Sequence, residues 1–191
     1  LIILRNPIDR AYSNYMHAVR DDWENLTFEE SIIQESSRIK ENWGWPYHYV
    51  KTGFYYNQVK AYVDNFKNIK IYLYDELKDS ENFIDSIFKF LNVKKINIEN
   101  KKEIFNASGY PKNKIIHKLI NNDSALKRLI KPIAKKILNR NSLKIIKNNN
   151  LKRMPLNLKT RQYLQGVYIE DIEKLSNLID RDLTNWIKDE L

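Results

Sequence analysis

Three side chains near the start of the sequence, Arg5, Ser13 and His17, have the types and spacing to bind a phosphate group. Arg5 directly follows the apolar run 1–4, and an arginine fork matches the geometry of phosphate oxygens. Ser13 can donate one more hydrogen bond, and one helical turn further on stands His17, a residue type that can titrate near neutral pH. In the simpler interpretation, Arg5 pairs with Asp9, and the serine and the histidine are solvated surface residues.

The segments around these residues predict a strand followed by a helix. Residues 1–4 form a continuous apolar run with β-branched members, which is typical of a short buried strand. Asn6 suits a helix N-cap, and Pro7 suits the first helical position. Ligands of open α/β sheets bind at the carboxyl ends of strands, so Arg5 is expected beside the free N–H groups of the helix start. Arg10, in the same helix, is expected to form a structural ion pair.

The remaining hydrophobic pattern predicts an α/β protein with a parallel sheet covered by helices and a helical C-terminal half. We expect a second buried strand at 69–74 and helices at 28–40, 82–91 and 158–179. Another helix, starting after Gly53, is expected to turn five residues inward: Tyr56, Val59, Tyr62, Val63 and Phe66. Two strands are too few for a stable sheet of this kind. The 191 residues are therefore expected to be the C-terminal portion of one domain whose N-terminal strands are missing.

Composition and charge exclude several kinds of site. The chain has no cysteine, which excludes disulfides, thiolate metal sites and a cysteine nucleophile. Its net charge of +9 is concentrated in residues 112–153, which hold thirteen lysines and arginines against one acid, Asp123. This basic segment is expected to be helical, with a break near Pro132. It could face solvent, an anionic glycan or a membrane surface; no groove-reading motif accompanies the charge, so nucleic acid is not expected as a partner.

The stretch from Arg5 to Ser13, Arg-Asn-Pro-x-x-Arg-Ala-Tyr-Ser, resembles the 3′-phosphate-binding motif of sulfotransferases that use PAPS, 3′-phosphoadenosine 5′-phosphosulfate. The Asn-Tyr-Met-His that ends at His17 resembles the heparan N-sulfotransferase branch and its bacterial relatives. The resemblance continues through GFYYNQVKAYVDNF, IKIYLYDELKDSENFIDSIFKFLNV and the stretch that ends at Trp186, so it spans nearly the whole chain. It implies the α/β fold of P-loop NTPases and the transfer of a sulfuryl group without a metal.

The resemblance assigns roles to particular residues. It implies that Arg5 and Ser13 hold the 3′-phosphate of PAPS, and that His17 lies near the transferred group as a candidate base. The family's glycine-rich, lysine-containing loop, which holds the 5′-phosphosulfate, has no counterpart among the four glycines of this chain. That loop, with the principal base and its lysine, is expected upstream of the first residue. Lys112 and Lys114 are candidates to contact the nucleotide.

The expected function is sulfuryl transfer from PAPS to a hydroxyl or amine acceptor, with carbohydrate as the acceptor class. Two rivals stay open: a relative of the P-loop nucleotide kinases, and a basic module that binds polyanions without catalysis. An enzyme should bind adenosine 3′,5′-bisphosphate in a manner that depends on Arg5, whereas a polyanion binder should depend on the lysines of 112–153. The richness in asparagine and lysine favours a bacterial protein of the cytoplasm over a eukaryotic one of the Golgi lumen.

Overall fold

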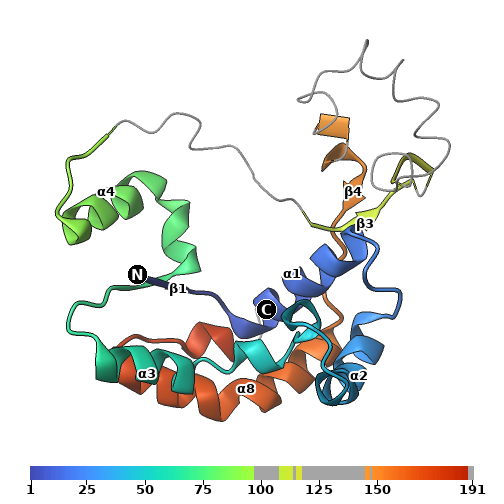
Figure 1. The fold of residues 1–191 in the computed structure, drawn as a ribbon, viewed down its shortest axis with the longest axis horizontal. Coiled ribbons are helices and arrows are strands. Elements are labelled where there is room, and N and C mark those ends of the chain that lie inside the picture. Colours follow the sequence, from blue (N-terminus) through green and yellow to red (C-terminus); the bar gives the residue numbers. More distant parts are fainter. Residues whose placement is uncertain (97–107, 114, 118–144, 147, 189–191) are drawn as a thin grey trace. The chain divides into compact units, whose positions relative to one another are not determined.

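The computed structural model describes residues 1–96, 108–113, 115–117, 145–146 and 148–188 (Figure 1). These residues belong to two compact units: the first comprises Leu1–Tyr12, His48–Ile104 and Asn157–Leu191, and the second comprises Ser13–Tyr47 and Phe105–Leu156. The helix α1, Pro7–Arg20, leads from the first unit into the second. Lys114 and most of the basic segment, including the expected break near Pro132, lie outside the described residues.

The first unit contains a parallel pair of strands, β1 (Ile2–Leu4) and β2 (Ile71–Leu73), with Ile2 opposite Ile71 and Leu4 opposite Leu73. The prediction of parallel strands is confirmed. The second strand is shorter than the expected 69–74: it begins at Ile71, and at its carboxyl end the chain turns into the 3-10 helix η3, Tyr74–Lys78. The following helix α4, Ser80–Leu91, begins two residues earlier than predicted, since Asp79 caps it by accepting a hydrogen bond from the Asn82 N–H at 3.3 Å.

Two helices of the first unit, α3 (Tyr56–Asn65) and α8 (Leu158–Ile179), pack against each other. The bounds of α8 agree with the prediction, and its apolar stripe is buried: Leu164, Tyr168, Ile172 and Leu175. Val59 of α3 is 2% exposed, as expected. The expectation for Tyr62, Val63 and Phe66 is wrong, because these side chains are 54%, 39% and 58% exposed. The rings of Tyr62 and Phe66 stack on each other with centroids 5.8 Å apart. The helical period gives the direction of an apolar stripe but not how much of it a neighbour covers.

The second unit is built around the continuation of α1 and the helix α2, Phe28–Lys40, whose bounds match the prediction. Thr27 and Glu30 form a capping box at its start: the Thr27 hydroxyl accepts from the Glu30 N–H, and the Glu30 carboxylate accepts from the Thr27 N–H. The 3-10 helix η1, Trp45–Tyr47, packs against α2. Two short antiparallel strands, β3 (Tyr110–Pro111) and β4 (Leu151–Lys152), complete the described part of this unit.

None of the helices in the described part of the chain has the length and hydropathy that a bilayer span requires.

Candidate functional site

Arg5 lies where the sequence predicts it, between the end of β1 and the start of α1. Asn6 caps this helix by accepting a hydrogen bond from the Ile8 N–H at 3.0 Å. The side-chain amide of Asn6 also donates to the carbonyl of Trp186 at 3.4 Å, in the 3-10 helix η4 (Thr184–Trp186). These contacts fix the turn that carries Arg5, and Pro7 then occupies the first helical position, where its missing N–H costs nothing.

The guanidinium of Arg5 lies over an aromatic ring and not against a carboxylate. Its Cζ is 4.8 Å from the centroid of the Tyr74 ring, which directly follows β2. The alternative pairing with Asp9 does not form, because Asp9 accepts from Nη2 of Arg161 at 2.7 Å. Within the described residues, no acid forms an ion pair with Arg5. The arginine is half-buried and keeps its positive charge at the end of a parallel strand.

Ser13 and His17 lie one turn apart on α1, so their side chains share one face of that helix, and both are half-buried. The Nδ1 of His17 is shielded from solvent. These two residues belong to the second unit, whereas Arg5 belongs to the first. The shared phosphate site of Arg5 and Ser13, and the role of His17 as a base, therefore stay predictions.

Arg10, which the sequence suggested as an ion-pairing residue, has no acidic partner among the described residues. Its Nη2 donates instead to the backbone carbonyl of Tyr49. Its Nε is buried and has no hydrogen-bond partner within the same part of the chain. The expected ion pair is therefore not formed there. The arginine contacts a backbone oxygen instead, and a contact to backbone cannot be predicted from residue types.

Tyr55, just before α3, is a further polar residue in the first unit that the sequence analysis missed. Its ring is buried, and the N–H groups of Tyr55 and Tyr56 donate to the carboxylate of Asp171 at 2.7 and 3.1 Å. Burial raises the pKa of the Tyr55 hydroxyl to about 12, although the nearby charges of Arg10 and Arg5 act to lower it. The hydroxyl therefore stays protonated at neutral pH and can donate a hydrogen bond.

Lys112 lies in the second unit, at the end of β3, and its contacts are to backbone. Its N–H donates to the carbonyl of Asn150 at 2.6 Å, and its Nζ donates to the carbonyl of Asn149 at 2.7 Å. An ammonium has three donors, so this bond leaves capacity for another acceptor. Lys114 lies outside the described residues, and the nucleotide contact of either lysine stays a prediction.

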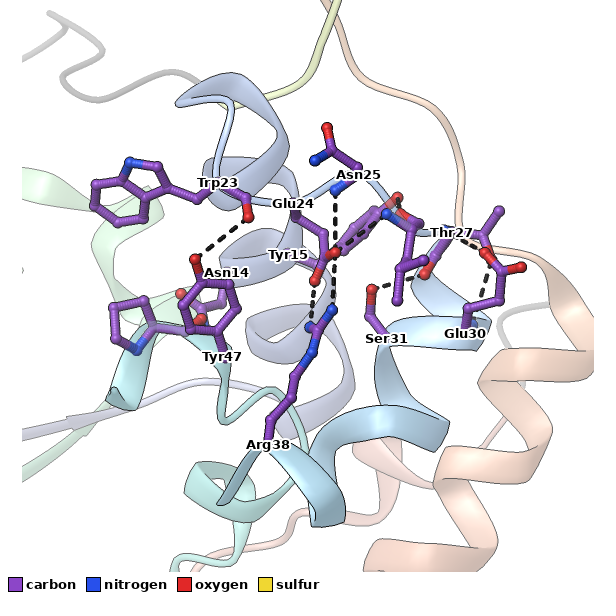
Figure 2. A network of polar contacts seen from close by, with 12 residues as sticks. Asn14, Tyr15, Trp23, Glu24, Asn25, Thr27, Glu30, Ser31, Arg38 and Tyr47 are labelled. Carbon is purple, nitrogen blue, oxygen red and sulfur yellow. Dashed lines mark hydrogen bonds and ion pairs between the residues drawn. The ribbon is translucent and has the colours of Figure 1, made fainter. Parts of the chain in front are cut away.

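A buried ion pair between Glu24 and Arg38 lies in the second unit (Figure 2). Arg38 of α2 donates to both carboxylate oxygens of Glu24, at 2.5 and 3.1 Å, and both side chains are buried. The Arg38 guanidinium also lies 4.9 Å from the ring centroid of Trp43 and 5.4 Å from that of Tyr47. The Tyr47 hydroxyl donates to the carbonyl of Trp23 at 3.3 Å. The ion pair therefore fixes the rings that surround it.

A metal site does not appear in the part of the chain that the structure describes: no three His, Cys, Asp or Glu side chains gather closely enough to hold an ion.

Comparison with known proteins gives one informative match. No protein-family model matches the chain, and no curated protein matches it. Among solved structures, the crystal structure of a sulfotransferase from Alicyclobacillus acidocaldarius is similar, with a TM-score of 0.68 and 26% sequence identity. The match covers 98% of this chain but 56% of that one, so the chain spans little more than half the length of the similar enzyme. The mixed α/β fold, with its small parallel sheet and its helices, is similar to that of this sulfotransferase.

Proposed function

We propose that this chain forms part of a sulfotransferase that transfers a sulfuryl group from PAPS to a hydroxyl or amine of a carbohydrate. The observation that carries the proposal is the position of Arg5. It lies at the carboxyl end of a parallel strand and directly before a capped helix, in a fold similar to that of a sulfotransferase. The positive end of the helix dipole and the free N–H groups of its first turn favour an anion at this position.

In this proposal Arg5 binds the 3′-phosphate of PAPS, and Ser13 donates a hydroxyl hydrogen bond to it. The fit to a phosphate rests on charge: Asp9 is already paired with Arg161, and Arg5 lies over the ring of Tyr74. A guanidinium without an acid beside it gains more from a dianionic phosphate than one that is already neutralised. Lys112 and Lys114 are proposed as additional contacts of the nucleotide.

The reaction is an in-line displacement at sulfur. The oxygen or nitrogen of the acceptor forms a new bond to sulfur while the bond from sulfur to the bridging oxygen breaks, and adenosine 3′,5′-bisphosphate leaves. The acceptor proton passes to a base, a role in which His17 is proposed to take part. Arg5 and Ser13 contribute by holding the nucleotide in one place, which converts an encounter between two solutes into a positioned reaction.

The carbohydrate acceptor is supported by exposed aromatic rings in the second unit. Trp23, Trp43 and Trp45 are 56%, 41% and 73% exposed, and the Nε1 of Trp43 donates to the Glu41 carboxylate at 3.1 Å. A flat ring beside polar groups suits the C–H face and the hydroxyls of a sugar.

A thermal-shift experiment tests the donor half of the proposal. Adenosine 3′,5′-bisphosphate should raise the melting temperature of the chain, because a ligand that binds only the folded state stabilises it. Adenosine 5′-monophosphate, which lacks the 3′-phosphate, should raise it much less. Equal shifts for the two nucleotides would favour a nucleotide kinase relative. A shift produced by polyanions and not by the bisphosphate would favour the non-catalytic basic module.

The acceptor half needs a separate test. Binding of sulfatable oligosaccharides, followed through tryptophan fluorescence, should weaken in Trp45→Ala and not in Trp186→Phe, whose ring lies buried in the first unit. Equal effects of the two substitutions would remove the aromatic surface from the proposal without touching the nucleotide site.

A further inference from the structure

Arg10 has a donor that the described residues do not satisfy. Its Nη2 donates to the Tyr49 carbonyl, whereas its Nε–H is buried without an acceptor in the described part of the chain. A buried charged donor without an acceptor is costly, by more than a neutral one. Such a group in a folded protein is commonly completed by an ion, a water molecule or a ligand.

The surroundings of Arg10 select an anion. The Arg10 side chain hydrogen-bonds the hydroxyl of Tyr55, and the charge of Arg5 also acts on that hydroxyl, so the two positive charges and one protonated hydroxyl lie in the same region of the first unit. Two acids of this unit already have partners. Asp9 pairs with Arg161, and Asp171, whose charge also acts on the Tyr55 hydroxyl, accepts from the N–H groups of Tyr55 and Tyr56. Two guanidinium groups that form no ion pair with a carboxylate in the described part of the chain favour a ligand with two negative charges.

We propose that Arg10 and Tyr55 form, with Arg5, a three-donor site for a phosphate monoester dianion. This inference rests on the proposed function, in which that phosphate is the 3′-phosphate of the nucleotide. It adds two ligands of the first unit to Arg5: the guanidinium of Arg10, through its Nε–H, and the hydroxyl of Tyr55. The Tyr49 carbonyl contact orients the Arg10 guanidinium, and the capped start of α1 adds its dipole to the same site.

Substitution of Arg10 tests the inference. Arg10→Lys keeps the positive charge but removes the Nε–H and the planar guanidinium. It therefore distinguishes a hydrogen bond to the anion from electrostatic attraction alone. Calorimetric titration of the full chain should show that Arg10→Lys weakens adenosine 3′,5′-bisphosphate about tenfold, as for the loss of a charged hydrogen bond. Adenosine 5′-monophosphate should be bound equally by the variant and the wild type. Arg153→Lys, which alters an exposed arginine of the second unit, should change neither affinity.

Tyr55→Phe provides a second variant, because it removes only a hydroxyl and keeps the buried ring. It should weaken the bisphosphate by less than Arg10→Lys does, and it should again leave the monophosphate unchanged. If either variant lowers the melting temperature but weakens both nucleotides equally, that residue only supports the fold. Unchanged bisphosphate affinity in both variants would overturn the three-donor site.

Inorganic phosphate separates this inference from the proposed function. If the wild type binds no bisphosphate but binds inorganic phosphate in a manner that depends on Arg10, the anion site stands and the nucleotide assignment fails. If bisphosphate binding depends on Arg5 and not on Arg10, the proposed function stands and this inference fails. If neither ligand binds to the folded chain, both are overturned.

Discussion

Asp9 and Arg161 form an ion pair of 2.7 Å between two segments of the first unit that are 152 residues apart in the sequence. The pair ties the first turn of α1 to the first turn of α8. Because Asp9 is paired with Arg161, the acid closest in sequence to Arg5 and Arg10 forms no ion pair with either of them. The positive charge of these two arginines therefore remains for a ligand.

Replacement of Asp9 should raise the affinity for the bisphosphate. Asp9→Asn removes a negative charge from the surroundings of Arg5 while keeping the size of the side chain, so binding should strengthen severalfold at low salt and less at high salt. The same substitution removes a favourable acid from the start of a helix and should cost about 0.3–1 kcal/mol of stability. Calorimetry at two salt concentrations checks the first effect, and denaturant unfolding checks the second. Weaker binding in Asp9→Asn would contradict the account.

Removing only one partner of the Glu24–Arg38 ion pair should lower the free energy of unfolding by several kcal/mol. Both side chains are buried, and Glu24 also accepts from the N–H groups of Asn25 and Leu26 at 3.0 and 3.1 Å. Arg38→Met leaves a buried carboxylate without its cation and should lower the free energy of unfolding by about 3–5 kcal/mol.

The double variant Glu24→Gln, Arg38→Met should recover part of that loss, because no uncompensated charge then remains. Urea unfolding of both variants measures the difference. Lys60→Ala breaks the exposed pair Lys60–Asp64 and serves as a control that should show no measurable change. If the double variant is as unstable as Arg38→Met, the unpaired charge of Glu24 is not the cause of the lost stability.

Gly53 and Gly166 should respond oppositely to alanine. A Cβ at Gly53 would lie 2.6 Å from the hydroxyl oxygen of Tyr168, which is fully buried and donates to the Val50 carbonyl at 2.8 Å. Gly53→Ala should therefore cost about 1–3 kcal/mol. A Cβ at Gly166, inside α8, meets nothing within 4 Å, so Gly166→Ala should stabilise the protein by about 0.5–1 kcal/mol. Melting temperatures that moved in the same direction would contradict this packing.

Tyr55 should make the protein less stable at alkaline pH. Its hydroxyl has a pKa of about 12 in the folded protein against 10.0 for an ordinary tyrosine. Above the ordinary pKa the unfolded chain releases this proton while the folded chain retains it, so stability falls as pH rises between 10.0 and about 12. The total loss should be about 2–3 kcal/mol. It is measured as the difference between wild type and Tyr55→Phe, and parallel curves for the two proteins would contradict the shift.

Much of the secondary structure could be predicted because its determinants are local. Thr27 and Glu30 mark the start of α2, and a continuous apolar period marks α8. The two strands were recognisable from short apolar runs, and Asn6 and Pro7 fixed the start of α1. The position of Arg5 at the end of a strand followed directly from these elements.

The partners of the charged side chains could not be predicted, because they depend on which segments the tertiary structure brings together. Asp9 pairs with an arginine 152 residues away, and Glu24 pairs with one 14 residues away. Arg10 contacts a backbone carbonyl, and such a contact cannot be predicted from residue types because every residue carries a carbonyl. The exposure of Tyr62 and Phe66 likewise depends on how far α8 extends over α3, which a helical period alone does not tell.

The most direct test of the central claim is calorimetric titration of the wild type, Arg5→Ala and Ser13→Ala with adenosine 3′,5′-bisphosphate. The account predicts that the wild type binds, that Arg5→Ala loses about tenfold or more, and that Ser13→Ala loses less, since a neutral hydrogen bond is weaker than a charged one. The affinity for adenosine 5′-monophosphate should be the same in all three proteins. Bisphosphate binding that is identical in the wild type and in a folded Arg5→Ala variant would contradict the account.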